Sequence, residues 1–175
     1  MVTHMITTKR TPAGDAVTAL ILDVFRLNGL LLMDGDRLVA PLGLTSARWQ
    51  VLGAIAYAER AQPVAWLARD MGANRQNVQR IVNDLQKAGL VKLEANPHHR
   101  RASLVVLTGK GRRVFDEAMR AQAPRVNALS NDLAIKDIET ARRVVTALRT
   151  KLESGGERPS VSSPALPVQN AAGRR

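Results

Sequence analysis

The sequence predicts a mainly α-helical protein with one small β-hairpin, and three observations support this fold class. Two short segments with helical apolar spacing flank a glycine, Gly72. Two β-prone runs, Leu90–Glu94 and Ala102–Leu107, follow with a polar stretch between them. Longer segments with helical spacing lie on both sides of this region. Two helices joined by a tight turn and followed by a hairpin form a winged helix-turn-helix, which we expect over residues 45–111.

The first long helix is expected within residues 15–35, after a flexible N-terminus over residues 1–14. Its apolar residues recur at helical spacing and comprise Val17, Leu20, Ile21, Val24, Leu27 and Leu31. The stretch Leu30–Met33 is apolar on more than one face. A helix of this kind needs other helices to cover it.

The helix-turn-helix itself is predicted from two apolar stripes. The first helix, Pro63–Met71, has the stripe Val64, Leu67, Ala68 and Met71, and Gly72 follows where a helix end favours a left-handed residue. The second helix, within residues 73–88, has the stripe Val78, Ile81, Val82 and Leu85, and Gly89 ends it. Asn74 is expected to cap it by accepting a hydrogen bond from the amide of Asn77.

The other face of the second helix is polar and contains no Asp or Glu between residues 73 and 83. An ordinary solvated surface is one interpretation, but such surfaces usually mix Glu with Lys and avoid Asn. Gln and Asn can pair with adenine edges and Arg with guanine, so the pattern favours reading of duplex DNA. The expected DNA-binding residues of this helix are Asn74, Arg75, Gln76, Asn77, Gln79, Arg80, Asn83 and Lys87.

The loop of the hairpin, residues 95–101, carries basic residues at or just past its tip. We expect His98, His99, Arg100 and Arg101 to contact DNA, because guanidinium groups can enter the negative minor groove. The alternative is a loop that is polar only because water surrounds it.

The C-terminal segment, residues 112–153, is also expected to be helical, with Thr108 as the N-cap and a break or bend at Pro124. Its apolar residues alternate in steps of three and four, as in a coiled-coil seam: Ile138, Ala141, Val145, Leu148 and Leu152. Together with residues 15–35 it predicts a homodimer about a two-fold axis. A bundle within one chain is the alternative. Residues 154–175, rich in Ser, Pro, Gly and Ala, are expected to be disordered.

Six sequence blocks resemble the MarR family of bacterial transcriptional regulators. They are Leu44–Leu52, Leu67–Gly72, Arg75–Leu85, Gly89–Val91, Asn96–Arg101 and Leu107–Gly111. The resemblance covers residues 15–153 and implies homodimeric winged helix-turn-helix lobes that control promoters in response to a ligand or to stress. It also implies a small aromatic or phenolic effector between the dimerisation helices and the lobe, with Phe25, Met33, Arg48 and Trp49 as candidates. Arg48 could instead meet phosphate or an acid such as Asp23, and Trp49 could belong to the core.

Two residues fall outside these patterns. The family wing usually carries an Asp, which pairs with an Arg, where this chain has His99, and the Arg is present as Arg101. Trp66 points away from the stripe of its helix, so it could pack on a neighbouring helix, cover a ligand pocket or touch a DNA sugar.

Composition limits the remaining classes of function. The formal net charge of +11 favours polyanionic partners such as nucleic acid, and the absence of Cys excludes disulfides and thiolate chemistry. We expect no membrane span, because no stretch of about 20 apolar residues is evident, and no signal peptide. No catalytic, metal-binding or cofactor motif is evident, so we expect no enzyme and a cytoplasmic location.

The sequence therefore predicts a sequence-specific regulator that binds double-stranded DNA, a ligand-responsive repressor acting as a homodimer on an inverted repeat. The alternative is a non-specific architectural DNA-binding protein or a winged-helix interaction module.

Overall fold

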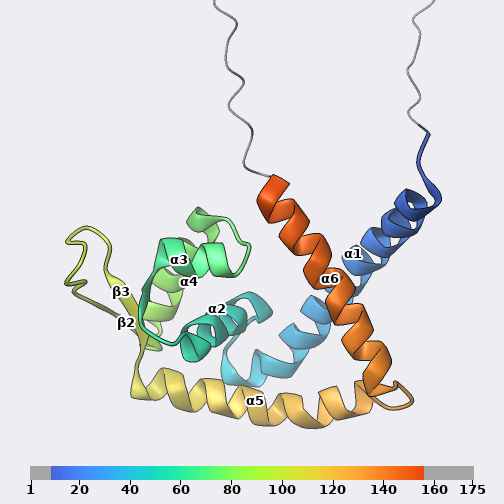
Figure 1. Ribbon diagram of the computed structural model, residues 1–175. Coiled ribbons are helices and arrows are strands. Elements are labelled where there is room, and N and C mark those ends of the chain that lie inside the picture. The colour runs from blue at the N-terminus through green and yellow to red at the C-terminus, as the bar shows by residue number, and fades with distance from the viewer. Residues whose placement is uncertain (1–8, 156–175) are drawn as a thin grey trace, which may run out of the picture. The chain divides into compact units, whose positions relative to one another are not determined.

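The computed structural model defines residues 9–155, which are mainly helical with one small sheet, as expected. Two compact units divide after Leu129. The elements of the first unit are α1 (Pro12–Val39), η1 (Ala40–Leu42), α2 (Ser46–Tyr57), β1 (Gln62–Pro63), α3 (Val64–Asp70), α4 (Arg75–Lys87), β2 (Val91–Glu94), β3 (Leu104–Leu107) and α5 (Gly109–Leu129) (Figure 1). The second unit contains α6 (Ile135–Gly155).

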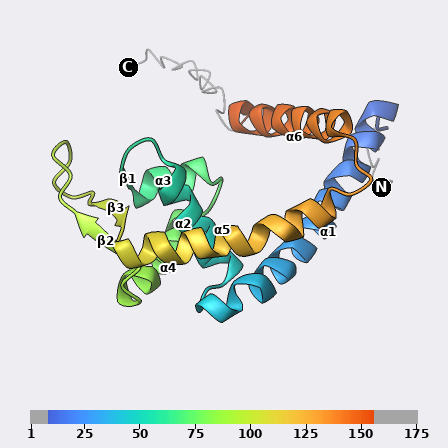
Figure 2. The same ribbon diagram turned by 90° about the horizontal axis from the view of Figure 1, so that it is seen from below.

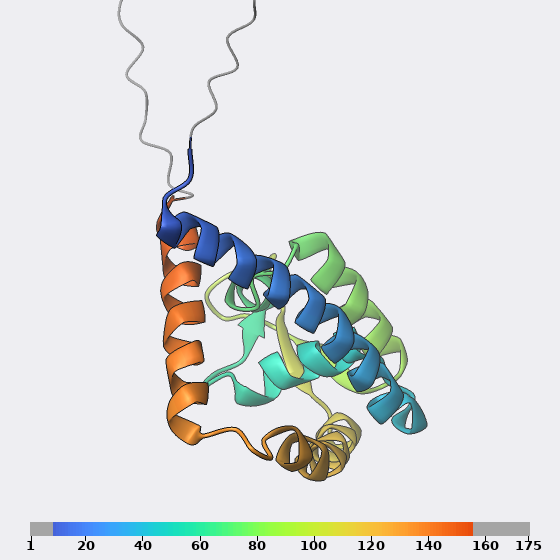
Figure 3. The ribbon, with the colours of Figure 1, turned by 90° about the vertical axis from the view of Figure 1, so that its right-hand side faces the viewer.

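Helix α1 is a single long helix that begins three residues before the expected start (Figure 3). The Oγ1 of Thr11 accepts the amide of Gly14 at 3.0 Å, and Pro12 occupies the first turn, where a missing N–H costs nothing. The expected flexible segment therefore ends before Pro12, and its first eight residues lie outside the described part of the chain.

The exposed surface of α1 is apolar to a degree that the sequence interpretation did not recognise. An 18-residue window has a mean hydropathy of 1.7 and is not buried within the chain. By length and composition this helix could cross a membrane, so the expectation that no such stretch exists was wrong. Asp23 and Arg26 interrupt the apolar run, but the mean hydropathy of the window stays high despite these two charges. The two side chains pair with each other at 3.3 Å.

The C-terminal half of α1 is anchored to α2 and α5. Ser46 is buried, its amide donates to Asp36, and its Oγ donates to the carbonyl of Leu32 at 2.8 Å. On α5, Arg125 forms a two-pronged pair with Asp34, with Nε–Oδ2 and Nη2–Oδ1 distances of 2.8 and 2.9 Å. These hydrogen bonds hold the pKa of the Asp34 carboxyl below its ordinary value. Helix α1 is thus fixed at one end to the rest of its unit.

The core of the first unit forms where α2, α3, α4, the sheet and α5 meet. Helix α5 runs from the hairpin past α2 to α1 (Figure 2). Every residue of the two predicted apolar stripes is buried except Met71, which packs against the core while partly exposed. The largest fully buried side chains are Val39, Val51, Leu52, Leu67, Val78, Val82, Leu85, Val91 and Val105.

The sheet has the order β1-β3-β2, with both pairs antiparallel. The hairpin of β2 and β3 is confirmed, with Val91 opposite Leu107 and Glu94 opposite Leu104. The sequence did not predict β1, because two residues that include a proline carry no strand signal; Gln62 lies opposite Val105 through tertiary pairing alone. This third strand ties the start of α3 to the part of β3 that is nearer the wing loop.

Two expectations about the C-terminal helices need correction. We expected a break or a bend at Pro124, but helix α5 continues through this residue without a break and ends at Leu129. The helix that follows extends through Ser154 to Gly155, where we had expected the disordered tail to begin. Residues 156–175 lie outside the described chain. Thr108 caps α5 as predicted, since its Oγ1 accepts the amide of Gly111 at 3.0 Å.

Candidate nucleic-acid interface

The apolar stripe of helix α4 is buried in the core, so the face that stays exposed is polar. Val78, Ile81, Val82 and Leu85 are all buried. The Oδ1 of Asn74 accepts amides from both Gln76 (2.9 Å) and Asn77 (3.3 Å), which confirms the predicted cap and adds a second bond. Gly72, which follows α3, and Gly89, which follows α4, have φ values of +61° and +70°, as their positions required.

Six of the predicted DNA-binding side chains on α4 are exposed on this face: Arg75, Gln76, Asn77, Arg80, Asn83 and Lys87. Gln79 is half-buried, and its Nε2 donates to Asn83 Oδ1 at 2.9 Å. Arg80 donates to Asn77 Oδ1 at 3.0 Å. These hydrogen bonds link neighbouring polar side chains along the exposed face.

An acid next to this face, Asp84, is neutralised by an ion pair. Asp84, one residue beyond Asn83, pairs with Arg48 of α2 at 3.4 Å, and both side chains are about one-third exposed. Arg48 therefore does not pair with Asp23, which is held by Arg26. The pair neutralises a charge that would repel phosphates and connects α2 directly to α4.

The wing loop is braced by its own side chains. Asn96 donates to the carbonyl of Ala102 at 2.9 Å and accepts the amide of His98 at 3.0 Å. His99 Nδ1 accepts the backbone amide of Arg101 at 3.3 Å. The resemblance to the MarR family implied an Asp at position 99, but here an imidazole stabilises the loop. The guanidinium of Arg101 stays exposed.

The four effector candidates do not share one environment. Phe25 and Met33 are exposed by 69% and 54% on α1, whereas Trp49 is half-buried and packs against the core. Arg48 is engaged by Asp84.

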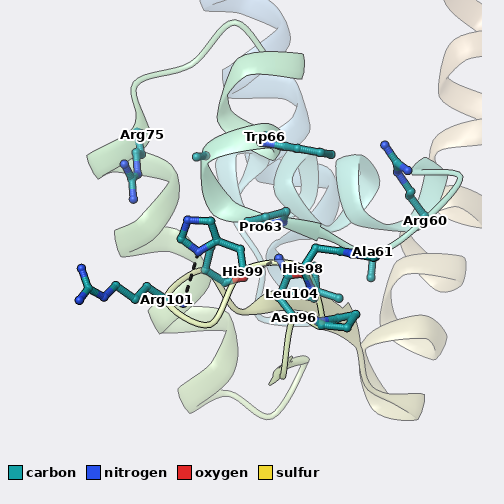
Figure 4. Close-up of a pocket in the computed structure, with 13 residues that line it drawn as sticks. Arg60, Ala61, Pro63, Trp66, Arg75, Asn96, His98, His99, Arg101 and Leu104 are labelled. Atoms are coloured by element: carbon teal, nitrogen blue, oxygen red, sulfur yellow. Dashed lines mark hydrogen bonds between the residues drawn. The ribbon is translucent and has the colours of Figure 1, made fainter.

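A hollow of about 770 Å³ lies instead between α3 and the wing (Figure 4). Residues Arg60, Trp66 and Arg75 line it together with wing residues that include His98, His99 and Arg101. Arg60 and Arg69 lie 5.5 and 5.7 Å from the centre of the Trp66 ring. The sequence singled out Trp66 but not Arg60, because the contact depends on how the segment after α2 folds back.

Comparisons with known proteins agree with this geometry. A family model described as MarR family matches residues 42–102. An uncharacterised protein of Mycobacterium tuberculosis is 43% identical over 145 residues, which covers 79% of this chain and 98% of the relative. The transcriptional activatory protein BadR of Rhodopseudomonas palustris is 29% identical over 147 residues, covering 77% and 82%. Among solved structures, the transcriptional repressor CouR bound to a 23-mer DNA duplex superposes with a TM-score of 0.67 at 22% identity, covering 81% of this chain and 99% of that one.

Proposed function

Because this chain belongs to the MarR family and has the DNA-binding fold of its transcription regulators, we propose that it acts as a homodimer on an inverted repeat and represses its target promoter until a small ligand binds. The observation that carries the proposal is the acid-free polar face of α4 beside a basic wing in one lobe. Transcription regulation rather than catalysis is the activity of this family.

Helix α4 is proposed to lie in the major groove. Gln76, Arg80 and Asn83 would reach base edges, since amides suit adenine and guanidinium suits guanine. Lys87, near the end of the helix, would meet phosphate. Arg100 and Arg101 of the braced wing would enter the neighbouring minor groove, where the potential is most negative. The distribution of charge supports this: from residue 69 to 120 there are eleven Lys or Arg against five Asp or Glu.

The dimer is proposed to form through α1, α5 and α6. Large apolar side chains on α1 are exposed in the single chain, including Phe25 at 69%, Leu30 at 65% and Leu27 at 54%. On α6 the predicted seam is exposed as well, with Leu152 at 77%, except at the half-buried Leu148. A second copy of the same surface would cover these faces without exposing new ones, which is how two-fold interfaces close. This accounts for the hydropathy of α1 without a bilayer and suits a protein that works in the cytoplasm.

Ligand response is proposed to act through Arg48. This residue is close to the start of α2, which Ser46 joins to α1, and it pairs with Asp84 on α4. Of the four effector candidates, Arg48 is the one that a small aromatic or phenolic acid would bind, in competition with Asp84 for the guanidinium. Loss of the pair would free α4 to shift and would leave Asp84 unpaired near phosphates. A dimer that occupies its operator would block the promoter, and release would restore transcription.

Selection of bound fragments from a random DNA pool tests the proposal. Two α4 helices on a two-fold axis should select inverted repeats whose half-site centres lie about 10 to 11 base pairs apart. Recovery of asymmetric sites would contradict the dimer on a palindrome. Loss of binding in the presence of excess random duplex would favour the alternative, a non-specific architectural protein.

Base reading by α4 can be separated from phosphate contact. We expect Gln76→Ala or Arg80→Ala to cost about 1–3 kcal/mol on the selected site and to relax preference at one base pair. Lys87→Ala is the control, because loss of a phosphate contact should weaken all sequences alike. Binding titrations against single-base variants of the site measure both effects. Equal losses on selected and random DNA for Gln76→Ala and Arg80→Ala would show that this face does not read bases.

A further inference from the structure

The hollow between α3 and the wing has a cationic rim. Its lining includes Arg60, Arg75, Arg101 and two histidines but no Asp or Glu. Within residues 9–155, no carboxylate lies within salt-bridge distance of these three arginines. No nearby carboxylate therefore neutralises their charges, and the rim suits an anionic partner.

The floor of the hollow is apolar and contains Trp66, which is 43% exposed. The Arg60 guanidinium covers this ring at 5.5 Å, an arrangement that leaves the N–H donors at the guanidinium edge available. Arg69 covers the ring too, but it also pairs with Asp70 at 3.4 Å, so Arg60 is the better phosphate ligand of the two. Pro63, Pro97 and Leu104 complete the apolar surface.

The positions of the cations distinguish an extended partner from a compact one. Figure 4 shows Arg60 at one end of the hollow and Arg75 and Arg101 at the other. A small organic anion with one carboxylate would meet one end only, whereas a strand with successive phosphates would meet both. Arg75 is the first residue of α4, and Arg101 belongs to the wing. The hollow thus touches both the element proposed for the major groove and the one proposed for the minor groove.

We propose that this hollow seats a sugar–phosphate strand of the duplex, with deoxyribose packed on the part of Trp66 that the arginines leave exposed and with Arg60 and Arg75 on phosphates at either end. The inference rests on the proposed DNA binding and extends the interface to α3 and to the segment before β1. Of the three roles that the sequence left open for Trp66, it assigns contact with a DNA sugar. The contact is to the backbone, so it adds affinity without base preference.

The two tryptophans of the chain allow a direct test. Trp49→Phe leaves Trp66 as the reporter, and Trp66→Phe leaves the half-buried Trp49 as the matched control. Addition of the selected duplex should change the emission of Trp66 and leave that of Trp49 nearly unchanged. Sodium benzoate is the second probe. A response of Trp66 to benzoate at millimolar concentration, with none to the duplex, would overturn the inference in favour of a small-anion site.

Binding measured over a range of salt concentrations supplies the second arm. Arg60→Ala should lower affinity about 3- to 10-fold and reduce the slope of log K against log[salt] by about 1, on selected and random DNA alike. Trp66→Ala should lower affinity with the slope unchanged, and Trp66→Phe should restore most of it. Arg120→Ala, an exposed arginine on α5 outside the hollow, is the matched charge control. Far-UV circular dichroism checks that each variant is folded.

The proposed regulator and the proposed seat for a DNA strand can be disproved separately. If the wild type shows no preference for an inverted repeat, the proposed regulator is wrong whatever the variants do. If the wild type binds its repeat but Arg60→Ala and Trp66→Ala bind as tightly as Arg120→Ala, only the seat for the DNA strand is wrong.

Discussion

Replacement of Leu27 and Leu30 by glutamate is expected to convert the protein to monomers and to lower its affinity for the inverted repeat by about 100-fold or more. Both side chains are more than half exposed on α1 and belong to the face that the proposed dimer buries. Four carboxylates placed in one two-fold interface would be desolvated without partners, which costs far more than the lost apolar burial. A monomer then binds one half-site alone. It loses the gain in affinity, about 10²- to 10⁴-fold, that comes from linking two DNA-binding lobes.

Analytical ultracentrifugation and binding titrations measure the two effects. The matched control is Leu27→Met with Leu30→Met, which keeps the face apolar at nearly the same volume and should remain dimeric. Neither leucine belongs to the core of the winged lobe, so the monomer should keep its helical circular dichroism spectrum. A wild type that sediments as a monomer, or a glutamate variant that remains dimeric, would contradict the proposed interface.

The elements that were predictable from the sequence are those specified by neighbouring residues. The apolar stripe of α4, its Asn74 cap and the glycines at both ends lie within about 18 residues, and each was found where the pattern placed it. The hairpin was predictable for the same reason, because alternation and turn chemistry are local. The family was predictable from several sequence blocks that keep a fixed order, whereas no single pattern could specify it.

The features that escaped prediction depend on tertiary contacts. Strand β1 exists only because Gln62 meets Val105, and the Arg48–Asp84 pair joins residues 36 positions apart. Pro124 illustrates the opposite error: a residue that usually ends a helix is accommodated inside α5. The start of α1 was missed for another reason. A polar segment that contains Pro12 and Gly14 suggested a flexible terminus, although Thr11 followed by Pro12 is the usual beginning of a helix.

The junction of α5 with the hairpin is expected to be the most sensitive backbone position in the lobe. Gly111 is buried, and a Cβ added there would overlap the carbonyl group of Leu90. That carbonyl cannot easily move, because it accepts the amide of Thr108 at 3.0 Å, while Thr108 Oγ1 donates to the carbonyl of Gly89 at 2.7 Å. The close approach of α5 to the start of β2 therefore requires glycine.

We expect Gly111→Ala to lower the free energy of unfolding by about 1–3 kcal/mol or more, because backbone must shift to admit one methyl group. Gly109→Ala is the matched control: it lies two residues earlier in α5, and its added Cβ would come no closer than 3.7 Å to the end of the Arg113 side chain. The control should be neutral or slightly stabilising, since alanine favours helix over glycine. Urea unfolding followed by circular dichroism compares the two variants with the wild type. Equal midpoints for both would mean that β2 and α5 separate readily, and that the wing is not held by this contact.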